Sequence, residues 1–173
     1  MKRHEKGFTL IEILIAVSIS TLVVVAASIA VYQVMRNTQH TSNRMTAVLQ
    51  VQNAGDWISR DTLVAQSITT GNVTTTDFLT FGWTEIGSGD EWHVVYTLED
   101  MPGTGLKTLV RSQSVNGGDN SSTLIARFIV PDAVKTLCEY SQDKLNLTIT
   151  ATVGDGPEQE TETRKYEIVP RSS

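Results

Sequence analysis

Apolar residues are concentrated in one N-terminal stretch of the chain. From Phe8 to Met35 the sequence is almost wholly apolar, and Glu12 is the one formally charged residue in that stretch. Because a helix rises about 1.5 Å per residue, the stretch would reach roughly 40 Å, which exceeds the roughly 30 Å hydrocarbon core of a bilayer. The pattern therefore predicts a membrane-spanning helix over residues 8–35.

The polar sequence that follows does not interrupt this helix. Residues 36–71 contain no proline, and their apolar positions recur mostly at three- and four-residue steps. We expect one helix from about Phe8 to Ile68, with Gly71-Asn72 as its stop signal. Residues 36–71 would then form an amphipathic segment that packs on a head domain.

The expected apolar stripe of this segment faces the head, and its polar face is expected to meet water. The stripe consists of Met45, Val48, Leu49, Ala54, Trp57, Ile58, Val64 and Ile68. The polar residues lying largely between these positions are Asn43, Arg44, Gln52, Asp56, Arg60 and Asp61.

Residues 72–173 have the pattern of a β-rich head, because short runs rich in β-formers alternate with glycine-rich turn clusters. The expected strands are 77–83, 91–98, 107–112, 123–130, 134–140, 145–153 and 164–169. In the run 145–153, alternate residues are apolar, so one face of that strand should cover the helix stripe. The predicted fold class is therefore α+β, with a long N-terminal helix packed on an antiparallel sheet.

Composition narrows the possible functions. The chain has 14 basic and 19 acidic residues, and no dense Lys/Arg tract follows the first six residues, which argues against a nucleic-acid partner. Cys138 is the sole cysteine and cannot form an intrachain disulfide. No catalytic motif, cofactor motif or metal-ligand cluster is evident, so we predict no catalytic residue, cofactor or metal. A calcium site at Asp119-Asn120, or at Asp155 with Glu158, stays open.

The predicted membrane helix is preceded by a short basic leader, residues 1–7. Lys2, Arg3 and Lys6 lie in this leader, and the positive-inside rule keeps such residues in the cytoplasm. A secretory signal peptide is disfavoured, because the apolar run is far longer than the usual core of about 7 to 15 residues. A plain signal anchor would explain the leader and the helix, but it does not account for Glu12.

The position of Glu12 requires an explanation, since an unpaired carboxylate in a membrane helix carries a large free-energy cost. It lies four residues after Phe8, on the same helix face. Cleavage between Gly7 and Phe8 would create an ammonium at the helix N-terminus, where it opposes the helix dipole. Pairing Glu12 with the Phe8 amine of a neighbouring chain would relieve both charges and set the register of an assembly.

The run Lys6-Gly7-Phe8-Thr9-Leu10-Ile11-Glu12-Ile13-Leu14-Ile15-Ala16-Val17 closely resembles the N-terminus of type IV prepilins and of the pseudopilins of secretion and competence systems. The resemblance implies that a membrane-embedded prepilin peptidase cuts after Gly7 and methylates Phe8, and that Glu12 serves assembly. It also implies other pilin or pseudopilin subunits and an inner-membrane assembly platform as partners. The protein would be single-pass in the cytoplasmic membrane, with the N-terminus inside and the head outside.

Within that family, three short runs and a closing strand resemble the minor pseudopilin called J and its minor-pilin relatives. The runs are residues 57–61, 94–98 and 109–111, and the strand ends at residues 168–171. The expected function is that of a structural subunit of a pilus or pseudopilus, in a minor tip or initiation position. A pilus-tip adhesin that binds through its head loops and a membrane-anchored enzyme are the alternatives, and the secretion, competence or motility system stays open.

Overall fold

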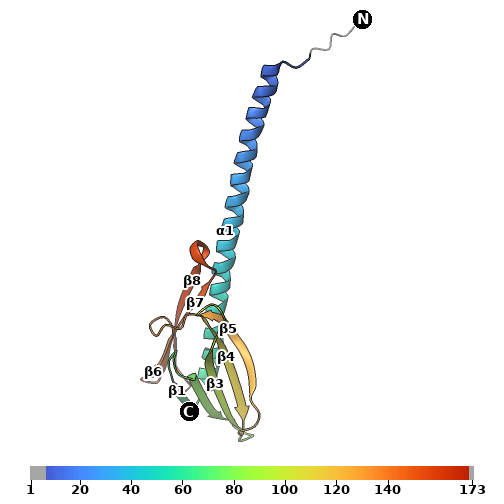
Figure 1. Ribbon diagram of the computed structural model, residues 1–173. Helices are drawn as coiled ribbons and strands as arrows, with labels where there is room; N and C mark the ends of the chain where they lie inside the picture. The colour runs from blue at the N-terminus through green and yellow to red at the C-terminus, as the bar shows by residue number, and fades with distance from the viewer. Residues whose placement is uncertain (1–6, 172–173) are drawn as a thin grey trace. The chain divides into compact units, whose positions relative to one another are not determined.

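The computed structural model describes residues 7–171. The chain divides into two compact units, one up to Thr41 and one from Ser42 onward. The long helix α1 (Leu10–Val64) begins in the first unit and ends in the second (Figure 1). Every strand of the described residues belongs to the second unit.

The helix of the N-terminal unit is apolar on nearly all sides up to Met35. In the described part of the chain, α1 alone is long and apolar enough to cross a membrane, with a mean hydropathy of 2.6 over its most apolar 18 residues, none of them buried. The hydroxyls of Ser18, Ser20, Thr21 and Ser28 donate to carbonyls four residues earlier. Because these hydroxyls are satisfied within the helix, they can face lipid at low cost.

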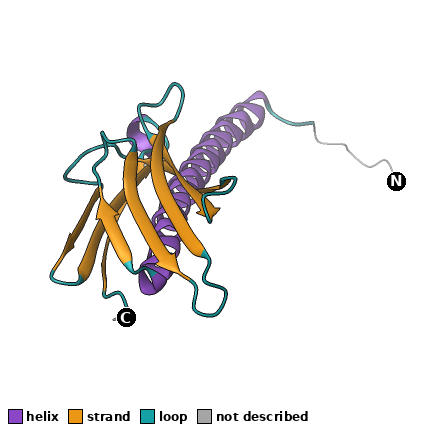
Figure 2. Cartoon of the chain, turned by 90° about the horizontal axis from the view of Figure 1, so that it is seen from below, coloured by secondary structure: helices purple, strands orange, loops and turns teal. Residues whose placement is uncertain are grey.

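The second unit contains a curled antiparallel sheet around the C-terminal part of α1. The strands are β1 (Ser67–Thr70), β2 (Asp77–Thr84), β3 (Glu91–Asp100), β4 (Lys107–Val115), β5 (Ser121–Ile129), β6 (Leu137–Ser141), β7 (Lys144–Val153) and β8 (Glu160–Ile168). The spatial order is β1-β2-β3-β4-β5-β7-β6, with β8 also paired to β7. Figure 2 shows the broad strands of the sheet in front of the helix. The predicted α+β architecture of helix and antiparallel sheet is therefore confirmed.

The core lies between the sheet and residues 42–64 of α1. Val51, Ala54 and Ile58 of the helix belong to one buried cluster with the apolar residues of β7. The alternating residues Leu145, Leu147, Ile149 and Ala151 are all at most 1% exposed. The expectation that this face covers the helix is confirmed.

The expected helix stripe was wrong in part. Met45, Leu49 and Val64 are more than half exposed, and the two polar positions Asn43 and Asp61 are buried instead. The buried face consists of Asn43, Ala47, Val51, Ala54, Gly55, Ile58, Asp61 and Thr62. Small residues dominate this face because the sheet lies close to the helix backbone. A search for large apolar residues therefore identifies the wrong face of the helix.

The helix also ends earlier than expected, at Val64. The backbone N–H of Gln66 already donates to the Gly82 carbonyl, and residues 67–70 pair with β2 as the short strand β1, which the sequence analysis missed. Gly71-Asn72 lies in the connection between these strands, where the Asn72 side chain accepts from the backbone of Thr74. Pairing with an available strand edge here outweighs helix propensity.

The seven expected strands are all present, with shifted ends. The largest shift is at β8, which begins at Glu160 rather than at residue 164. Strand β6 begins at Leu137 because Val134 lies in a turn and is 84% exposed. The nominally polar face of β7 is also partly covered, since Thr150 is fully buried and donates to the Lys135 carbonyl. Hydroxyls on this face therefore replace water contacts with internal hydrogen bonds.

Gly55 of α1 marks a close approach of helix and sheet. A Cβ at this position would collide with the ring of Tyr166 on β8, whose hydroxyl donates to the Val51 carbonyl at 3.1 Å. The absent side chain therefore lets the ring lie against the helix backbone, which also explains the presence of a glycine inside a long helix despite its unfavourable helix propensity.

Replacing Gly55 by alanine should therefore destabilise the protein, although alanine is the better helix former. We expect Gly55→Ala to lower the free energy of unfolding by about 1–3 kcal/mol through overpacking, measured by urea unfolding of the full chain in detergent micelles. Asp56→Ala at the exposed neighbouring position serves as the control. Adding Tyr166→Leu to Gly55→Ala should recover part of the loss, and a more stable Gly55→Ala protein would contradict the assigned clash.

Candidate functional site

The start of α1 is closed by a capping box made by Thr9 and Glu12. The Thr9 backbone N–H and hydroxyl both donate to Oε2 of Glu12, each at 2.8 Å, and the Glu12 N–H donates to the Thr9 hydroxyl at 3.4 Å. Thr9 is the residue before the first helical residue, Leu10, and Glu12 is the third residue of the helix. Reciprocal bonding of this kind satisfies otherwise free N–H groups at a helix start.

Only one oxygen of the Glu12 carboxylate is occupied by this capping box. Within residues 7–171, both Thr9 bonds end on Oε2, and no hydrogen bond or ion pair reaches Oε1. The carboxylate lies at the positive end of the helix dipole, where a negative charge is stabilised. It can therefore cap its own helix and still accept a donor from outside.

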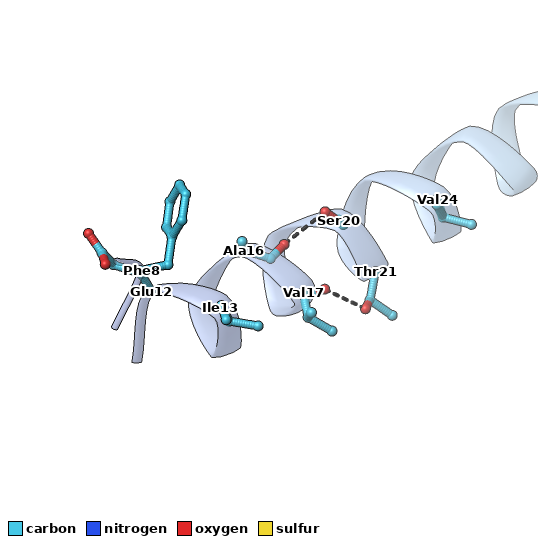
Figure 3. A pocket seen from close by; sticks show the side chains of 8 residues that line it. All are labelled: Phe8, Glu12, Ile13, Ala16, Val17, Ser20, Thr21 and Val24. Atoms are coloured by element: carbon cyan, nitrogen blue, oxygen red, sulfur yellow. Dashed lines mark hydrogen bonds between the residues drawn. The ribbon is translucent and has the colours of Figure 1, made fainter. Parts of the chain in front are cut away.

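The same end of the helix has an open hollow of about 660 Å³. It is lined by Phe8, Glu12, Ile13, Ala16, Val17, Ser20, Thr21 and Val24. Figure 3 shows Ile13, Val17, Thr21 and Val24 along one side of the helix, with Phe8 and Glu12 at its start. Beyond Glu12 the lining is apolar or internally hydrogen-bonded, which suits an apolar helix or lipid rather than a polar ligand.

Of the residues singled out for processing and assembly, the structure describes Gly7, Phe8 and Glu12. Gly7 precedes the helix, a Cβ there would meet no atom within 4 Å, and Phe8 is 84% exposed. The junction between them is thus sterically open. The leader charges Lys2, Arg3 and Lys6 lie outside the described residues.

The capping box is a feature that the sequence analysis missed. The signal was present, since Thr9 and Glu12 form the spacing Thr-x-x-Glu directly at an apolar run. It gives Glu12 a role within its own chain, in addition to the pairing expected with a neighbour.

A second polar cluster lies in the core of the head, where Asp61 of α1 meets Arg111 of β4. Arg111 Nε donates to Asp61 Oδ2 at 2.7 Å and Arg111 Nη2 to Asp61 Oδ1 at 3.1 Å, a two-pronged ion pair. The Tyr96 hydroxyl of β3 donates to the same Oδ2 at 2.5 Å. Trp57 lies against the guanidinium, with 5.3 Å from the central guanidinium carbon to the ring centroid.

The sequence analysis expected Asp61 on the wet face of the helix, and this expectation was wrong. Asp61 and Arg111 are each 7% exposed, whereas Arg60 is exposed as expected. The cluster joins the three runs that carried the resemblance to the J subclass, residues 57–61, 94–98 and 109–111. These runs are thus one packed unit of the core, which a reading of each run alone does not reveal.

Electrostatics in this cluster favour the paired state. Burial, together with the neighbouring Asp61 carboxylate, raises the pKa of Tyr96, so its hydroxyl stays protonated and donates. Burial lowers the pKa of Arg111, but hydrogen bonding to Asp61 and its charge outweigh burial and raise the pKa overall. No buried side-chain polar atom of the described residues lacks a partner, so the charge pair is fully satisfied.

Cys138 is not a reactive group in the head, and the calcium positions at Asp119-Asn120 and at Asp155 with Glu158 stay a prediction. Cys138 is buried and unpaired, and burial, reinforced by Glu139, raises its pKa to about 12, which keeps the thiol protonated and unreactive. Across residues 7–171, no group of three or more His, Cys, Asp or Glu side chains is arranged to hold a metal ion.

Comparison with known protein families gives a match at the N-terminus. Residues 2–28 match the family described as the prokaryotic N-terminal methylation motif. No curated protein and no solved structure matches the chain.

A long N-terminal helix, apolar in its first part and packed on a curled antiparallel sheet in its second part, defines a pilin-like architecture of the α+β class. The methylation motif supports the type IV prepilin and pseudopilin family for this chain, and the resemblance carried by residues 6–17 is confirmed. The motif supports a prepilin-like subunit, of the kind that prepilin peptidase processes and that assembles with other pilin subunits. The motif and the long apolar helix support anchoring in a membrane.

Replacing Arg111 alone should destabilise the protein more than replacing both Asp61 and Arg111. We expect Arg111→Met to lower the free energy of unfolding by about 3–5 kcal/mol, because it leaves the Asp61 carboxylate buried and unpaired. The double variant Asp61→Asn with Arg111→Met should lose less, since the introduced amide can still accept from Tyr96 without a charge. Urea unfolding followed by near-ultraviolet circular dichroism measures both.

Arg44→Met, at an exposed position on the same helix, is the matched control and should stay within about 0.5 kcal/mol of the unaltered protein. If Arg111→Met proved as stable as Arg44→Met, the buried pair would not hold the helix on the sheet.

Proposed function

We propose that this subunit is cut after Gly7, is methylated at Phe8, and enters a type IV pilus or pseudopilus as a minor component near the tip. Residues 1–7 are the leader, and residues 8–35 hold the chain in the cytoplasmic membrane as a single span with its N-terminus inside. The methylation motif over residues 2–28 and the open Gly7–Phe8 junction support this processing. The resemblance of three core runs to the J subclass supports the minor position.

The observation that carries the proposal is the half-occupied carboxylate of Glu12. Its Oε2 is bonded to Thr9, while its Oε1 has no partner in the described residues. Cleavage after Gly7 exposes an ammonium at Phe8, and in a bundle of such helices that ammonium of one subunit binds Oε1 of the next. Glu12 then caps its own helix and pairs with its neighbour at the same time, which fixes the axial register.

Assembly requires little net change in apolar contact. The helix leaves lipid for neighbouring helices of the same kind, so its exposed side chains exchange one apolar environment for another. The pair between the Phe8 ammonium and the Glu12 carboxylate adds a specificity that contacts with lipid lack. The two charges meet at one axial register of the neighbouring helices alone. The assembly platform in the inner membrane and the other subunits are the partners in this step.

Processing can be tested directly on the full chain from native membranes. With prepilin peptidase present, the intact mass and N-terminal peptide should correspond to a chain that starts at N-methylated Phe8. Without the peptidase, residues 1–7 should remain. If the chain kept residues 1–7 both with and without the peptidase, the N-terminal segment would act as a signal anchor and the processing proposal would be wrong.

The role of Glu12 can be separated from its capping role by two substitutions. Glu12→Gln keeps an acceptor for the Thr9 N–H but removes the charge, and Thr9→Val removes the hydroxyl but keeps the charge. We expect Glu12→Gln and Glu12→Ala to insert in the membrane normally, and to lower incorporation into filaments about tenfold or more. Thr9→Val should retain most incorporation.

Membrane fractionation and immunoblots of sheared filaments measure insertion and incorporation separately. Normal incorporation of Glu12→Gln would defeat the charge-pairing mechanism, and normal incorporation of Glu12→Ala would defeat any role of the side chain in assembly.

A further inference from the structure

Two stacked tryptophans lie at the end of the inner face of the sheet. Trp83 of β2 and Trp92 of β3 are direct partners in the strand register, with ring centroids 5.9 Å apart and planes inclined by 4°. Each lies two residues along its strand from a fully buried core residue, Phe81 or Val94, and side chains two residues apart point to the same face. The indole rings therefore lie on the face of the sheet that packs on the helix.

The helix does not cover this tryptophan pair completely. Both indoles are half-buried, whereas Phe81 and Val94 are fully buried. α1 ends at Val64, and in its last turn Leu63 and Val64 are 48% and 53% exposed. The inner face of the sheet is therefore partly open where the helix ends.

A hollow of about 590 Å³ lies at this place, and its volume is in the usual range for ligand sites. Ile86, in the turn between β2 and β3, contributes to its wall and is 98% exposed. The apolar lining of this end hollow includes Leu63, Val64, Trp83, Ile86 and Trp92. Large exposed apolar side chains gathered at one place are typical of a surface that binds a partner.

The polar side chains of the end hollow leave a positive charge unmatched. The Gln66 amide is bonded to the backbone of β2. The Glu85 carboxylate accepts from the Trp92 indole N–H at 3.4 Å and from the Ser88 hydroxyl at 3.2 Å. Arg171 is the one basic residue of the lining, and within residues 7–171 no hydrogen bond or ion pair reaches its guanidinium. A carboxylate is the ligand group that fits, since it can accept two parallel hydrogen bonds from a guanidinium.

We propose that the end hollow binds the C-terminal residue of a partner protein, where that residue has a large apolar side chain. The α-carboxylate binds the Arg171 guanidinium, and the side chain lies against Trp83 and Trp92. Leu63 and Ile86 contribute the aliphatic wall around it. One residue thus fills both parts of the site, because a terminal carboxylate and its side chain are attached to the same Cα.

A C-terminal residue fits better than an acidic residue within an extended segment. Successive side chains of an extended chain point to opposite faces, so an internal acid and its apolar neighbour do not enter one hollow together. A cationic ligand is disfavoured, since it would meet Arg171, and Glu85 already accepts from two donors. The site is independent of the proposed assembly mechanism, because the end hollow belongs to the head and Glu12 to the start of α1.

The test uses the full chain in micelles of a zwitterionic detergent and four short peptides. The first, acetyl-Gly-Ser-Gly-Phe, has a free C-terminal carboxylate, and the second is its C-terminal amide. The third, acetyl-Gly-Ser-Asp-Phe-Gly-Ser amide, carries its acid internally, and the fourth, acetyl-Gly-Ser-Gly-Ser, has a free carboxylate without an apolar side chain. Titration calorimetry, corrected for the heat of each peptide with micelles alone, measures binding. We expect the first peptide to bind, and the other three to bind at least about tenfold more weakly.

Substitutions in the end hollow identify the groups responsible for binding. Arg171→Gln should weaken binding of the free-acid peptide about tenfold and leave binding of its amide unchanged, because the guanidinium contacts the carboxylate alone. Ile86→Ala should weaken binding of both peptides about threefold, since part of the apolar contact is lost. Lys165→Gln and Val134→Ala, at exposed positions of the head outside the end hollow, are the matched controls and should bind as the unaltered protein does.

Arg171 and Ile86 are both exposed, so their variants are expected to fold and the comparison stays valid. The proposal is overturned if the free-acid peptide does not bind at about 1 mM, or if its amide binds as tightly. It is also overturned if Arg171→Gln binds the free-acid peptide as tightly as Lys165→Gln does. Equal binding of the peptide with the internal acid would contradict the assignment to a C-terminal residue.

Discussion

A single helix backbone, α1, has to satisfy two different environments along its length. Over the apolar part up to Met35 its side chains are exposed on all sides, which is stable in lipid or against similar helices. From Ser42 onward one face is buried under a curled sheet, and that face is built largely from small and polar residues. The rest of the structure follows from this division, since the sheet covers one half and the membrane the other.

Polar groups set the geometry at both ends of this helix. At its start, the Thr9–Glu12 capping box closes the helix and leaves one carboxylate oxygen for a second contact. Near its end, the Asp61–Arg111 pair ties the helix to β4 in a single position, because a buried charge pair has one satisfying geometry. Apolar packing is less selective between neighbouring registers than such pairs.

The limits of sequence reasoning follow from how far apart the interacting residues are. The apolar run, the strands and the Thr-x-x-Glu spacing are local patterns, so they can be read directly. Asp61 and Arg111 are 50 residues apart, and Tyr166 meets Gly55 from the last strand. Such contacts place an acid and a glycine on the buried face, and a periodicity search leaves both residues out of that face.

Local patterns were sufficient to predict the membrane segment, the processing motif, the fold class and seven of the strands, because each is encoded in composition or in short periodic runs. Three features emerged with the folded chain alone: where the helix ends, which of its faces is buried, and the burial of the Asp61–Arg111 pair. Those features depend on strand register and on close approach of distant segments. Strand register and close approach are determined by the energy of pairing between elements, and a short stretch of sequence carries no information about that energy.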